Sequence, residues 1–496
     1  MKTLIYIIFI ILPFSLVCQN SFELTIKTDI DDFAKDILQL DDGSYICVGS
    51  STDNVNDRSQ GIIFKISQEG SIIHQVNIIK PDTLVYIDVL DTINGNFVAC
   101  GRVTEIIQNE HFSSIYLYFF NSDLELIYEK IINLPPEYTL AYYRMMKTDG
   151  DNIFVSGEAR HRDFQTYMYD VFIYEFDAIA DSITANFILR EGIQFAEGYL
   201  LLPDNEGHYI FSFGTWEYNQ GMIIKYDAGL NIIETDTLPS DLLFDNYAMN
   251  LPSGNYLLSS RQWFDTSPGV FGGEEMRSVL YDMQRPNIPI KSYEYHMGTD
   301  SLSFPAALRS FDTTNMGEIY FSGTANVDGR TYPWQEYPSW IFLSKLDENL
   351  GHQWTKFYGG DMFYHIYTVK ATQDGGAIMA CRTYDYETQY WEHDIIIFKV
   401  DEDGLITGLG DEPAQIIAHD AIIYPNPGSS YLKVESGPQI DGAEFELFDM
   451  TGKMAARETL NSRLLEINTS HLPTGNYTYR ITWQNRLMGS GKWVKH

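Results

Sequence analysis

The sequence predicts an all-β protein with two parts, a large domain built from a repeated four-stranded unit and a small C-terminal β-sandwich. Three observations support this prediction. A tight turn followed by an apolar strand recurs through most of the chain. Aromatic residues form 14% of the chain, and most are Tyr and Phe, which favour strands. After about residue 421 the repeat stops, and short strands with alternating polarity take its place.

The repeat is clearest at Asp41–Ser50, where Asp-Asp-Gly precedes a short apolar run and a closing Gly. Asp-Gly and Asn-Gly supply the positive φ angles of a hairpin turn, and the apolar run suits a buried strand. Seven copies close at positions 49, 101, 157, 214, 260, 323 and 382. One apolar run precedes each turn, one follows it directly, and two more come after that. Each unit therefore holds four antiparallel strands. Units of this kind are typical of propeller blades, and we predict a seven-bladed β-propeller over residues 19–411.

The ends of this domain predict how it closes. The last repeat has three clear strands, while Ser21–Thr28 is a strand that belongs to no repeat. We expect Ser21–Thr28 to pair as the outer strand of the last blade, which would remove an open sheet edge. The alternative is a loosely packed N-terminal strand.

The N-terminus has the features of a secretory signal peptide. Met1–Cys18 contains one Lys, a long apolar run, and a break at Pro13. Cleavage after Cys18 would leave Gln19 as the first residue. The alternative is a lipoprotein with lipid on Cys18. No other stretch is long and apolar enough to span a bilayer, so we expect no transmembrane segment.

The formal charge of −35 excludes some partners. Such an acidic chain is repelled by nucleic acid and by anionic lipid, so we expect neither as a partner. Solubility alone explains the charge. Calcium is the alternative, because Asp29–Asp32 and Asp401–Gly404 are carboxylate clusters, although neither completes a spaced calcium loop. The 11 His show no ligand spacing, and no other metal or cofactor is predicted.

Three cysteines remain after the signal peptide, Cys47, Cys100 and Cys381. Each lies on the second strand of its repeat. Equivalent strands of different blades are too far apart for a disulfide. We interpret all three as buried apolar side chains.

The loops between second and third strands are long and rich in aromatic residues. In a four-stranded antiparallel blade these connections all lie on one face of the disc, so their rings converge there. Aromatic faces stack on sugars or fill protein hot spots, although they also pack against one another. The predicted binding residues are Trp216, Trp263, Trp334, Tyr337, Tyr386, Tyr390 and Trp391.

No catalytic motif is present, and no catalytic residue is predicted. Glu392, His393 and Asp394 are adjacent, but neighbouring strand residues point to opposite faces and make a poor triad. Six Asp-Ser/Thr-X triplets, including those at Asp91 and Asp312, resemble the O-glycosylation sequence of some secreted bacterial proteins.

The C-terminal part begins after a linker, residues 412–421, rich in acidic residues and Pro. Strands are expected at Tyr431–Val434, Glu444–Asp449, Leu464–Ile467 and near Tyr477, a pattern typical of a small β-sandwich. Its motifs are Tyr424-Pro425-Asn426-Pro427, a turn with Gly452 and Lys453, a turn with Gly475 and Tyr477, and a terminal segment with Lys492.

These four motifs, in this order, resemble the C-terminal sorting domain of type IX secretion substrates. The resemblance covers residues 422–496. It implies export through the outer membrane of a Gram-negative bacterium to the cell surface or the medium, with the secretion machinery as a partner. The activity of the remaining chain is not implied by it.

We therefore expect a secreted or cell-surface propeller that is a non-enzymatic glycan- or protein-binding module for adhesion. The alternative is a hydrolase acting on polysaccharide or peptide, with paired carboxylates on its loops. A purely structural surface protein is a third reading. The ligand would be an extracellular glycan or protein.

Overall fold

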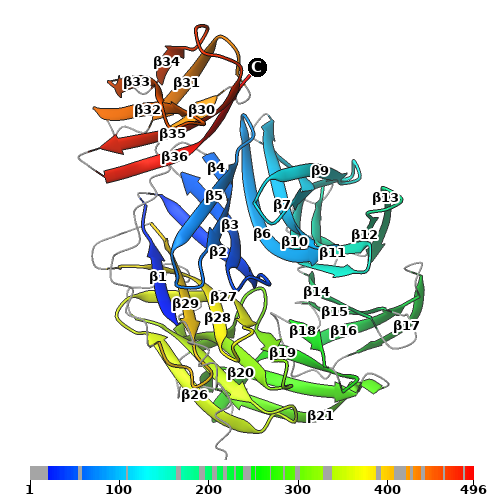
Figure 1. Cartoon of the computed structure of the whole chain (residues 1–496). Coiled ribbons are helices and arrows are strands. Elements are labelled where there is room, and N and C mark those ends of the chain that lie inside the picture. Colours follow the sequence, from blue (N-terminus) through cyan, green and yellow to red (C-terminus); the bar gives the residue numbers. More distant parts are fainter. Residues whose placement is uncertain are drawn as a thin grey trace, which may run out of the picture.

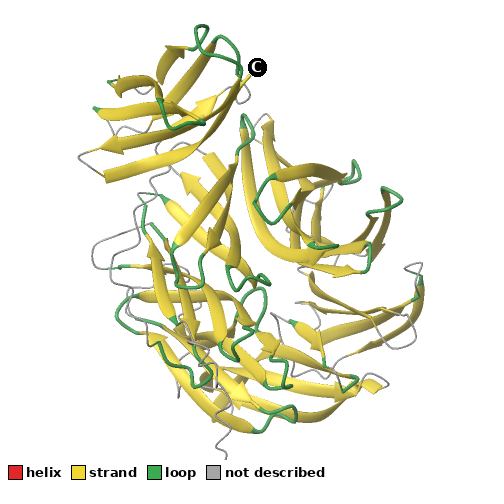
Figure 2. Ribbon diagram, viewed as in Figure 1, coloured by secondary structure: helices red, strands yellow, loops and turns green. Residues whose placement is uncertain are grey.

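The computed structural model describes the chain from residue 21 to residue 496 with internal gaps. The residues outside the description are 1–20, 29, 54–57, 108–109, 163–168, 189–195, 204–208, 216–219, 228–230, 238–246, 252, 268–269, 283–284, 296–301, 328–337, 387–391, 407–420, 425–427, 437–441, 462–463 and 484–485. The described part contains strands, turns and loops and no helix (Figure 2). This confirms the all-β prediction.

Most strands form four-stranded antiparallel sheets in which chain order is strand order. The first two sheets are β2 (Asp31–Gln39), β3 (Tyr45–Asp53), β4 (Arg58–Ile66) and β5 (Ile72–Ile78), then β6 (Thr83–Ile93), β7 (Asn96–Ile107), β8 (Glu110–Phe120) and β9 (Leu126–Asn133). A single parallel bridge, Ser59 to Leu84, joins them. The next sheet is β10 (Tyr138–Asp149), β11 (Asn152–His161), β12 (Tyr169–Asp177) and β13 (Ser182–Ile188).

The following sheets keep this order. They are β14 (Ala196–Pro203), β15 (Tyr209–Thr215), β16 (Gln220–Tyr226) and β17 (Ile232–Thr237), then β18 (Ala248–Asn250), β19 (Asn255–Ser267), β20 (Val270–Asp282) and β21 (Arg285–Tyr295). In the next sheet the first strand is broken into β22 (Leu302–Pro305) and β23 (Phe311–Thr313), which both pair with β24 (Ile319–Val327), and β25 (Trp340–Leu346) and β26 (His352–Gly359) follow.

The last of these sheets contains both ends of the repeat domain. It holds β27 (Phe363–Ala371), β28 (Ala377–Tyr384), β29 (Asp394–Val400) and, as its outer strand, β1 (Phe22–Ile26). β1 pairs antiparallel with β29, from Phe22 opposite Lys399 to Ile26 opposite Ile395. This confirms the predicted clasp, and Figure 1 shows blue β1 beside yellow β29.

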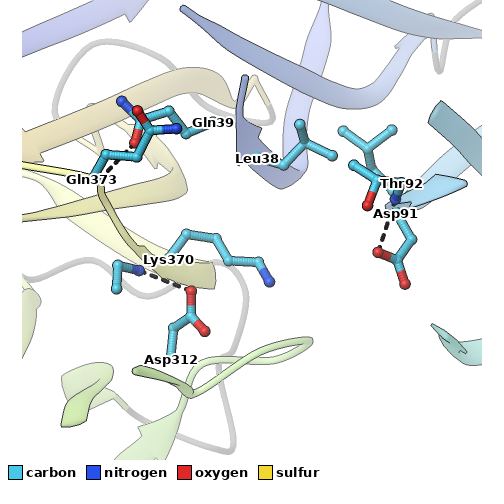
Figure 3. A pocket seen from close by; sticks show the side chains of 9 residues that line it. Leu38, Gln39, Asp91, Thr92, Asp312, Lys370 and Gln373 are labelled. Atoms are coloured by element: carbon cyan, nitrogen blue, oxygen red, sulfur yellow. Dashed lines mark hydrogen bonds between the residues drawn. The ribbon is translucent and has the colours of Figure 1, made fainter. Parts of the chain in front are cut away.

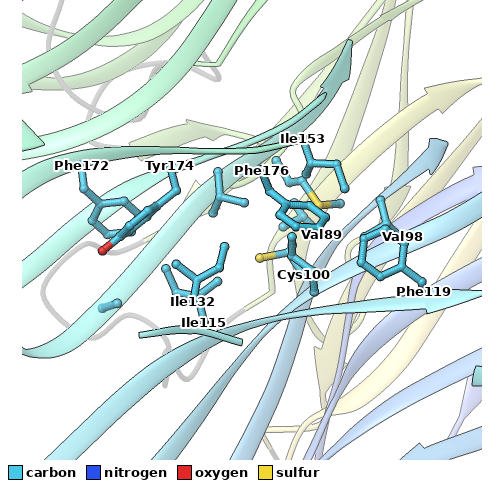
Figure 4. Packing of buried hydrophobic residues seen from close by; sticks show 14 of the residues in the cluster. Val89, Val98, Cys100, Ile115, Phe119, Ile132, Ile153, Phe172, Tyr174 and Phe176 are labelled. Carbon is cyan, nitrogen blue, oxygen red and sulfur yellow. The ribbon is translucent and has the colours of Figure 1, made fainter. Parts of the chain in front are cut away.

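Apolar side chains fill the spaces between successive sheets. One cluster joins β6–β8 to β10–β12 and includes Cys100 with Ile115, Val155 and Phe176 (Figure 4). Another joins the last sheet to the first, with Ile395 and Ile397 packed with Ile37 and Cys47. The sheets are therefore arranged in a propeller-like way, with the end of the domain packed on its start.

The three cysteines are buried and free, as predicted. Each is surrounded by apolar side chains in a different cluster. Burial raises the pKa of all three thiols well above the ordinary value. They are packing residues.

The C-terminal part is a sandwich of two sheets. One holds β30 (Ala421–Tyr424), β31 (Tyr431–Ser436) and β34 (Leu464–Asn468), and the other holds β33 (Met454–Leu460), β32 (Ala443–Asp449), β35 (Gly475–Trp483) and β36 (Arg486–Lys495). Leu432, Phe445 and Trp493 are fully buried in the core between them. The sandwich confirms the prediction, and β33 is an additional strand that sequence reasoning missed.

Candidate functional site

The first strand of each sheet is its inner strand, and four inner strands converge on one recess. The recess has a volume of ≈ 260 Å³ (Figure 3). It is lined by the ends of β2, β6, β23 and β27 and by the turn after β27. The lining residues are Leu38, Gln39, Leu90, Asp91, Thr92, Asp312, Lys370, Ala371 and Gln373. Inner strands end at the tight turns that lead to the second strands, so the recess lies at the turn end of the inner strands.

Backbone groups of neighbouring sheets hold the polar side chains of the recess. Asp91 accepts hydrogen bonds from Thr92 N (2.8 Å) and, across to β10, from Thr148 N (3.0 Å). Asp312 Oδ2 accepts one from Ala371 N at 2.9 Å, from β23 to β27. These bonds fix both carboxylates and tie adjacent sheets together.

One lysine lines the recess, and a second lysine interacts with it. The Lys370 ammonium extends into the recess (Figure 3). Lys147, on β10, interacts electrostatically with Asp91, Arg309 and Lys370, and burial lowers its pKa against the opposing effect of Asp91. Within the described part of the chain, neither ammonium has a carboxylate within 4.0 Å or a hydrogen-bond acceptor.

A buried ion pair lies at the centre of the inner strands. Arg309, between β22 and β23, donates from Nε to Asp36 Oδ2 at 3.1 Å and from Nη2 to Leu90 O at 3.0 Å. Asp36 is fully buried and also accepts from Leu90 N (2.9 Å) and Ile37 N (3.0 Å). The Arg309 backbone bonds to Tyr367 and Val369 of β27. Arg309 therefore links four sheets.

The inner strands share a β-bulge. In β2, β6, β10, β14 and β27 the register with the second strand shifts by one residue at mid-strand. Bulges re-aim a side chain and are frequent beside functional sites. The bulged residues are Lys35, Asp88, Arg144, Tyr199 and Tyr367. Lys35 Nζ lies 3.8 Å from the centre of the Tyr367 ring.

The opposite end of the inner strands carries the seam between the last and first sheets. His393 Nδ1 lies 3.0 Å from Asp31 Oδ1, and its backbone N donates to the same oxygen at 2.9 Å. Burial lowers the pKa of His393 to about 4, although Asp31 opposes this shift. Asp32, next to it, is bonded by the Thr28 hydroxyl, and burial raises its pKa to about 7. These residues join the ends of the domain.

The predicted acidic and triad-like clusters have structural contacts. Asp31 of the first acidic cluster pairs with His393, which belongs to the Glu392–Asp394 run. In the second cluster, Asp401 Oδ1 accepts from Asp403 N (3.0 Å) and Leu405 N (2.8 Å) within a turn. Among the described residues, no group of three or more His, Cys, Asp or Glu is placed to hold a metal ion. Calcium binding stays a prediction.

The predicted aromatic binding residues lie mostly outside the described residues. Those are Trp216, Trp334, Tyr337, Tyr390 and Trp391. For Trp263 the description covers the backbone, which pairs with Glu274 in β19–β20. Tyr386 is half-buried just after β28. The convergence of these rings on one face therefore stays a prediction.

The sequence analysis did not identify the residues that line the recess or those that form the Arg309–Asp36 ion pair. Asp36, Arg309 and Lys370 are far apart in the chain and belong to no motif. One signal was present, a charged residue at equivalent places in otherwise apolar inner strands, as at Asp91 and Lys370, each three residues after the bulged residue of its strand. Asp91 and Asp312 begin two of the Asp-Thr triplets, and each accepts a hydrogen bond from a backbone N–H of a neighbouring sheet.

The motif residues of the C-terminal sandwich form turns and core. Gly452 has a φ of 79° in the turn between β32 and β33, with Lys453 exposed after it. Tyr477 is buried against Trp493, with ring centres 5.7 Å apart. These contacts explain why the motif needs Gly and an aromatic residue there. The other motif residues are Gly475, which begins β35, Lys492, exposed on β36, Tyr424, which ends β30, and Pro425, Asn426 and Pro427, which lie outside the described residues.

Solved structures with similar strand arrangements include three enzymes or enzyme domains. The acylaminoacyl peptidase of Pyrococcus horikoshii is 12% identical over 83% of this chain and 58% of the peptidase, with a TM-score of 0.40. The β-propeller domain of the trilobed protease of Pyrococcus furiosus is 10% identical over 76% and 99%, with a TM-score of 0.41. An ulvan lyase of polysaccharide lyase family PL25 is 10% identical over 76% and 96%, with a TM-score of 0.43. These similarities concern the fold alone.

No curated protein matches the sequence. No helix in the described part of the chain is long and apolar enough to cross a membrane. One family model does match, and it covers the sandwich with its turn glycines and buried aromatic residues. Residues 422–495 are a secretion system C-terminal sorting domain, which marks the chain as a secreted protein that interacts with the type IX secretion machinery.

Proposed function

We propose that this protein is a non-enzymatic binding module that attaches to an extracellular glycan or protein, as in adhesion. In this proposal the repeat domain is a closed seven-bladed propeller, Met1–Cys18 is a cleaved signal peptide, and the sorting domain directs the chain out of a Gram-negative cell. The sorting domain supports the location, since it implies export. The nature of the module rests on the recess.

The observation that carries the proposal is a polar recess whose carboxylates are held in place by the fold. Its carboxylates are held by backbone N–H groups of neighbouring sheets, and the Arg309–Asp36 pair contacts Leu90, one of the lining residues. A site whose polar groups are fixed in advance binds with little loss of conformational entropy. The central charged groups serve sheet-to-sheet contacts, which favours binding over acid–base chemistry.

A second surface belongs to the same proposal. The aromatic loops, with Trp263 and Tyr386 among them, would supply flat rings for sugars or for a protein partner. The acidic clusters would add calcium if the module requires it.

The alternative is a hydrolase that acts on polysaccharide or peptide. One observation favours it, because the recess places two carboxylates, Asp91 and Asp312, on different inner strands around one space. Glycoside hydrolysis uses such a pair of carboxyl groups.

One experiment separates these functions. The chain from Gln19 to His496 is tested for binding to a panel of polysaccharides and extracellular proteins, and soluble product is measured in the same samples. Trp263→Ala and Trp334→Ala variants run beside it. We expect binding without product. Product that disappears in Asp91→Asn and Asp312→Asn would establish the hydrolase instead, and absence of both binding and product would favour a purely structural surface protein.

A further inference from the structure

The recess has hydrogen-bonding groups of both kinds that the protein does not use. Lys370 Nζ has three N–H groups and no acceptor within the described part of the chain. Asp312 uses Oδ2 for Ala371 N, and Oδ1 has no donor among the described residues. Asp91 lies across the recess, with Thr92 beside it (Figure 3). A ligand group that both donates and accepts hydrogen bonds suits this arrangement.

The charges around the recess do not form a positive site. One positive side chain, Lys370, and two negative ones, Asp91 and Asp312, line it. Beside it, Lys147 interacts with both Asp91 and Asp149, and the charges of Arg309 and Asp36 offset each other. The chain as a whole has a charge of −35, which repels an anionic polymer at long range. These two facts favour a neutral ligand with many polar groups.

The size of the recess limits what enters it. Its volume of ≈ 260 Å³ falls below the range of about 300–1,000 Å³ that encloses a drug-sized ligand. It therefore accommodates one end group of a larger molecule. The recess lies where the inner strands end and the tight turns begin, so the rest of such a molecule extends into solvent.

We infer that the recess binds the terminal sugar of a neutral glycan through two neighbouring hydroxyl groups. This inference rests on the proposed function and deepens it by naming the ligand class that the recess binds. One hydroxyl accepts from Lys370 Nζ and donates to Asp312 Oδ1, and its neighbour donates to Asp91. A hydroxyl group suits both roles, since it is one donor and two acceptors. Charged partners strengthen each of these bonds.

The test measures binding of methyl glycosides of glucose, galactose and mannose to the chain from Gln19 to His496. Binding is measured by saturation-transfer NMR and by titration calorimetry. For any glycoside that binds, the deoxy analogue is measured as well. The variants are Lys370→Met, which removes the donor, and Asp312→Asn, which keeps an acceptor for Ala371 N. Lys291→Met is the matched control, because Lys291 is exposed on the outer strand β21.

We expect Lys370→Met to weaken binding by about 10- to 100-fold, the effect of losing one hydrogen bond to a charged group. Asp312→Asn and the deoxy analogue weaken it as well, and Lys291→Met leaves it unchanged. Thermal unfolding of each variant shows whether it folds like the wild type.

Three results would overturn the inference. Sugar binding that survives Lys370→Met and Asp312→Asn but is lost in Trp263→Ala places the ligand on the aromatic face and leaves the proposed function intact. Binding of a free amino acid, and of no glycoside, identifies a zwitterion site. No glycoside binding by the wild type, with binding to a protein in the earlier panel, refutes the sugar and keeps the module.

Discussion

Arg309 should contribute more to stability than any other charged side chain between the inner strands, and Arg309→Met tests this. Met keeps most of the apolar stem and removes every donor. The change leaves Asp36 Oδ2 without its guanidinium partner at 3.1 Å and Leu90 O without its side-chain donor at 3.0 Å. Asp36 stays fully buried, so its charge has no access to water.

The expected loss follows from these contacts. Removing one partner of a buried ion pair costs about 3–5 kcal/mol, because the other charge stays buried. Asp36 keeps the backbone donors Ile37 N and Leu90 N, which places the loss near the lower limit. The Leu90 carbonyl oxygen also loses its side-chain donor, which adds about 1 kcal/mol to the loss. We therefore expect the free energy of unfolding to fall by about 4 kcal/mol.

The assay is urea unfolding of the chain from Gln19 to His496, followed by Trp fluorescence and circular dichroism. Arg457→Met is the control, since Arg457 pairs with Glu444 on the exposed surface of the sorting domain and should leave the propeller transition unchanged. The double variant Asp36→Asn with Arg309→Met removes the buried, unpaired charge of Asp36 and should recover part of the lost free energy of unfolding. A loss below about 1 kcal/mol, or a double variant no more stable than the single one, would refute the reasoning.

Three further predictions concern the seam, the pairing of β2 with β3 and the clasp. The raised pKa of Asp32, about 7 against an ordinary 3.8, means that protonated Asp32 stabilises the fold below about pH 4 and that this stability is lost as pH rises through 7. The thermal stability of Asp32→Asn relative to the wild type should therefore be greater at about pH 8 than at about pH 5. A Cβ on Gly49 would lie 1.7 Å from Phe33 O, so Gly49→Ala should destabilise the fold by about 3 kcal/mol or more in urea. Deletion of Ser21–Thr28 exposes the edge of β29 and removes three buried apolar side chains, a loss of about 5 kcal/mol or more with self-association in sedimentation.

Each of these has its own control. Equal stability differences at both pH values would contradict the assignment of the Asp32 effect to its charge. Gly95→Ala is the comparison for Gly49→Ala, because a Cβ on Gly95 meets nothing within 4 Å and only its φ of 74° is strained. The peptide Ser21–Thr28, added to the shortened chain, should restore part of its stability, and a monomeric, undiminished deletion variant would disprove the clasp's role.

Local patterns predicted the parts of the fold that depend on local chemistry. The turn glycines, the apolar second and third strands and the partner of Ser21–Thr28 follow from turn geometry, burial and the need to cover an edge. The strand Met454–Leu460 was not predicted, because most of its side chains are exposed and buried and exposed positions do not alternate along it. β2 begins at Asp31, earlier than its apolar run at Asp36, since its first residues face polar partners at the seam.

The candidate site depends on contacts that no local pattern encodes. Asp36 and Arg309 meet across 273 positions of sequence, and Asp31 and His393 across 362. Only the packing of the last sheets of the domain against the first brings them together. The shared bulge is equally hidden, because one extra residue in a strand changes which face a side chain occupies without changing the composition of the strand.

Lys370 and Arg309 differ in whether they hold the sheets together, and this separates binding from folding in experiments. Asp91, Asp312 and Gln39 each accept a backbone N–H of a neighbouring sheet, so the recess exists only when those sheets are correctly placed. Lys370 makes no such contact in the described part of the chain. Its loss should therefore change binding at constant stability, whereas loss of Arg309 should lower stability first and binding as a consequence. If Lys370→Met destabilised the propeller as much as Arg309→Met, the lysine would belong to the scaffold and the recess would lose its main free donor.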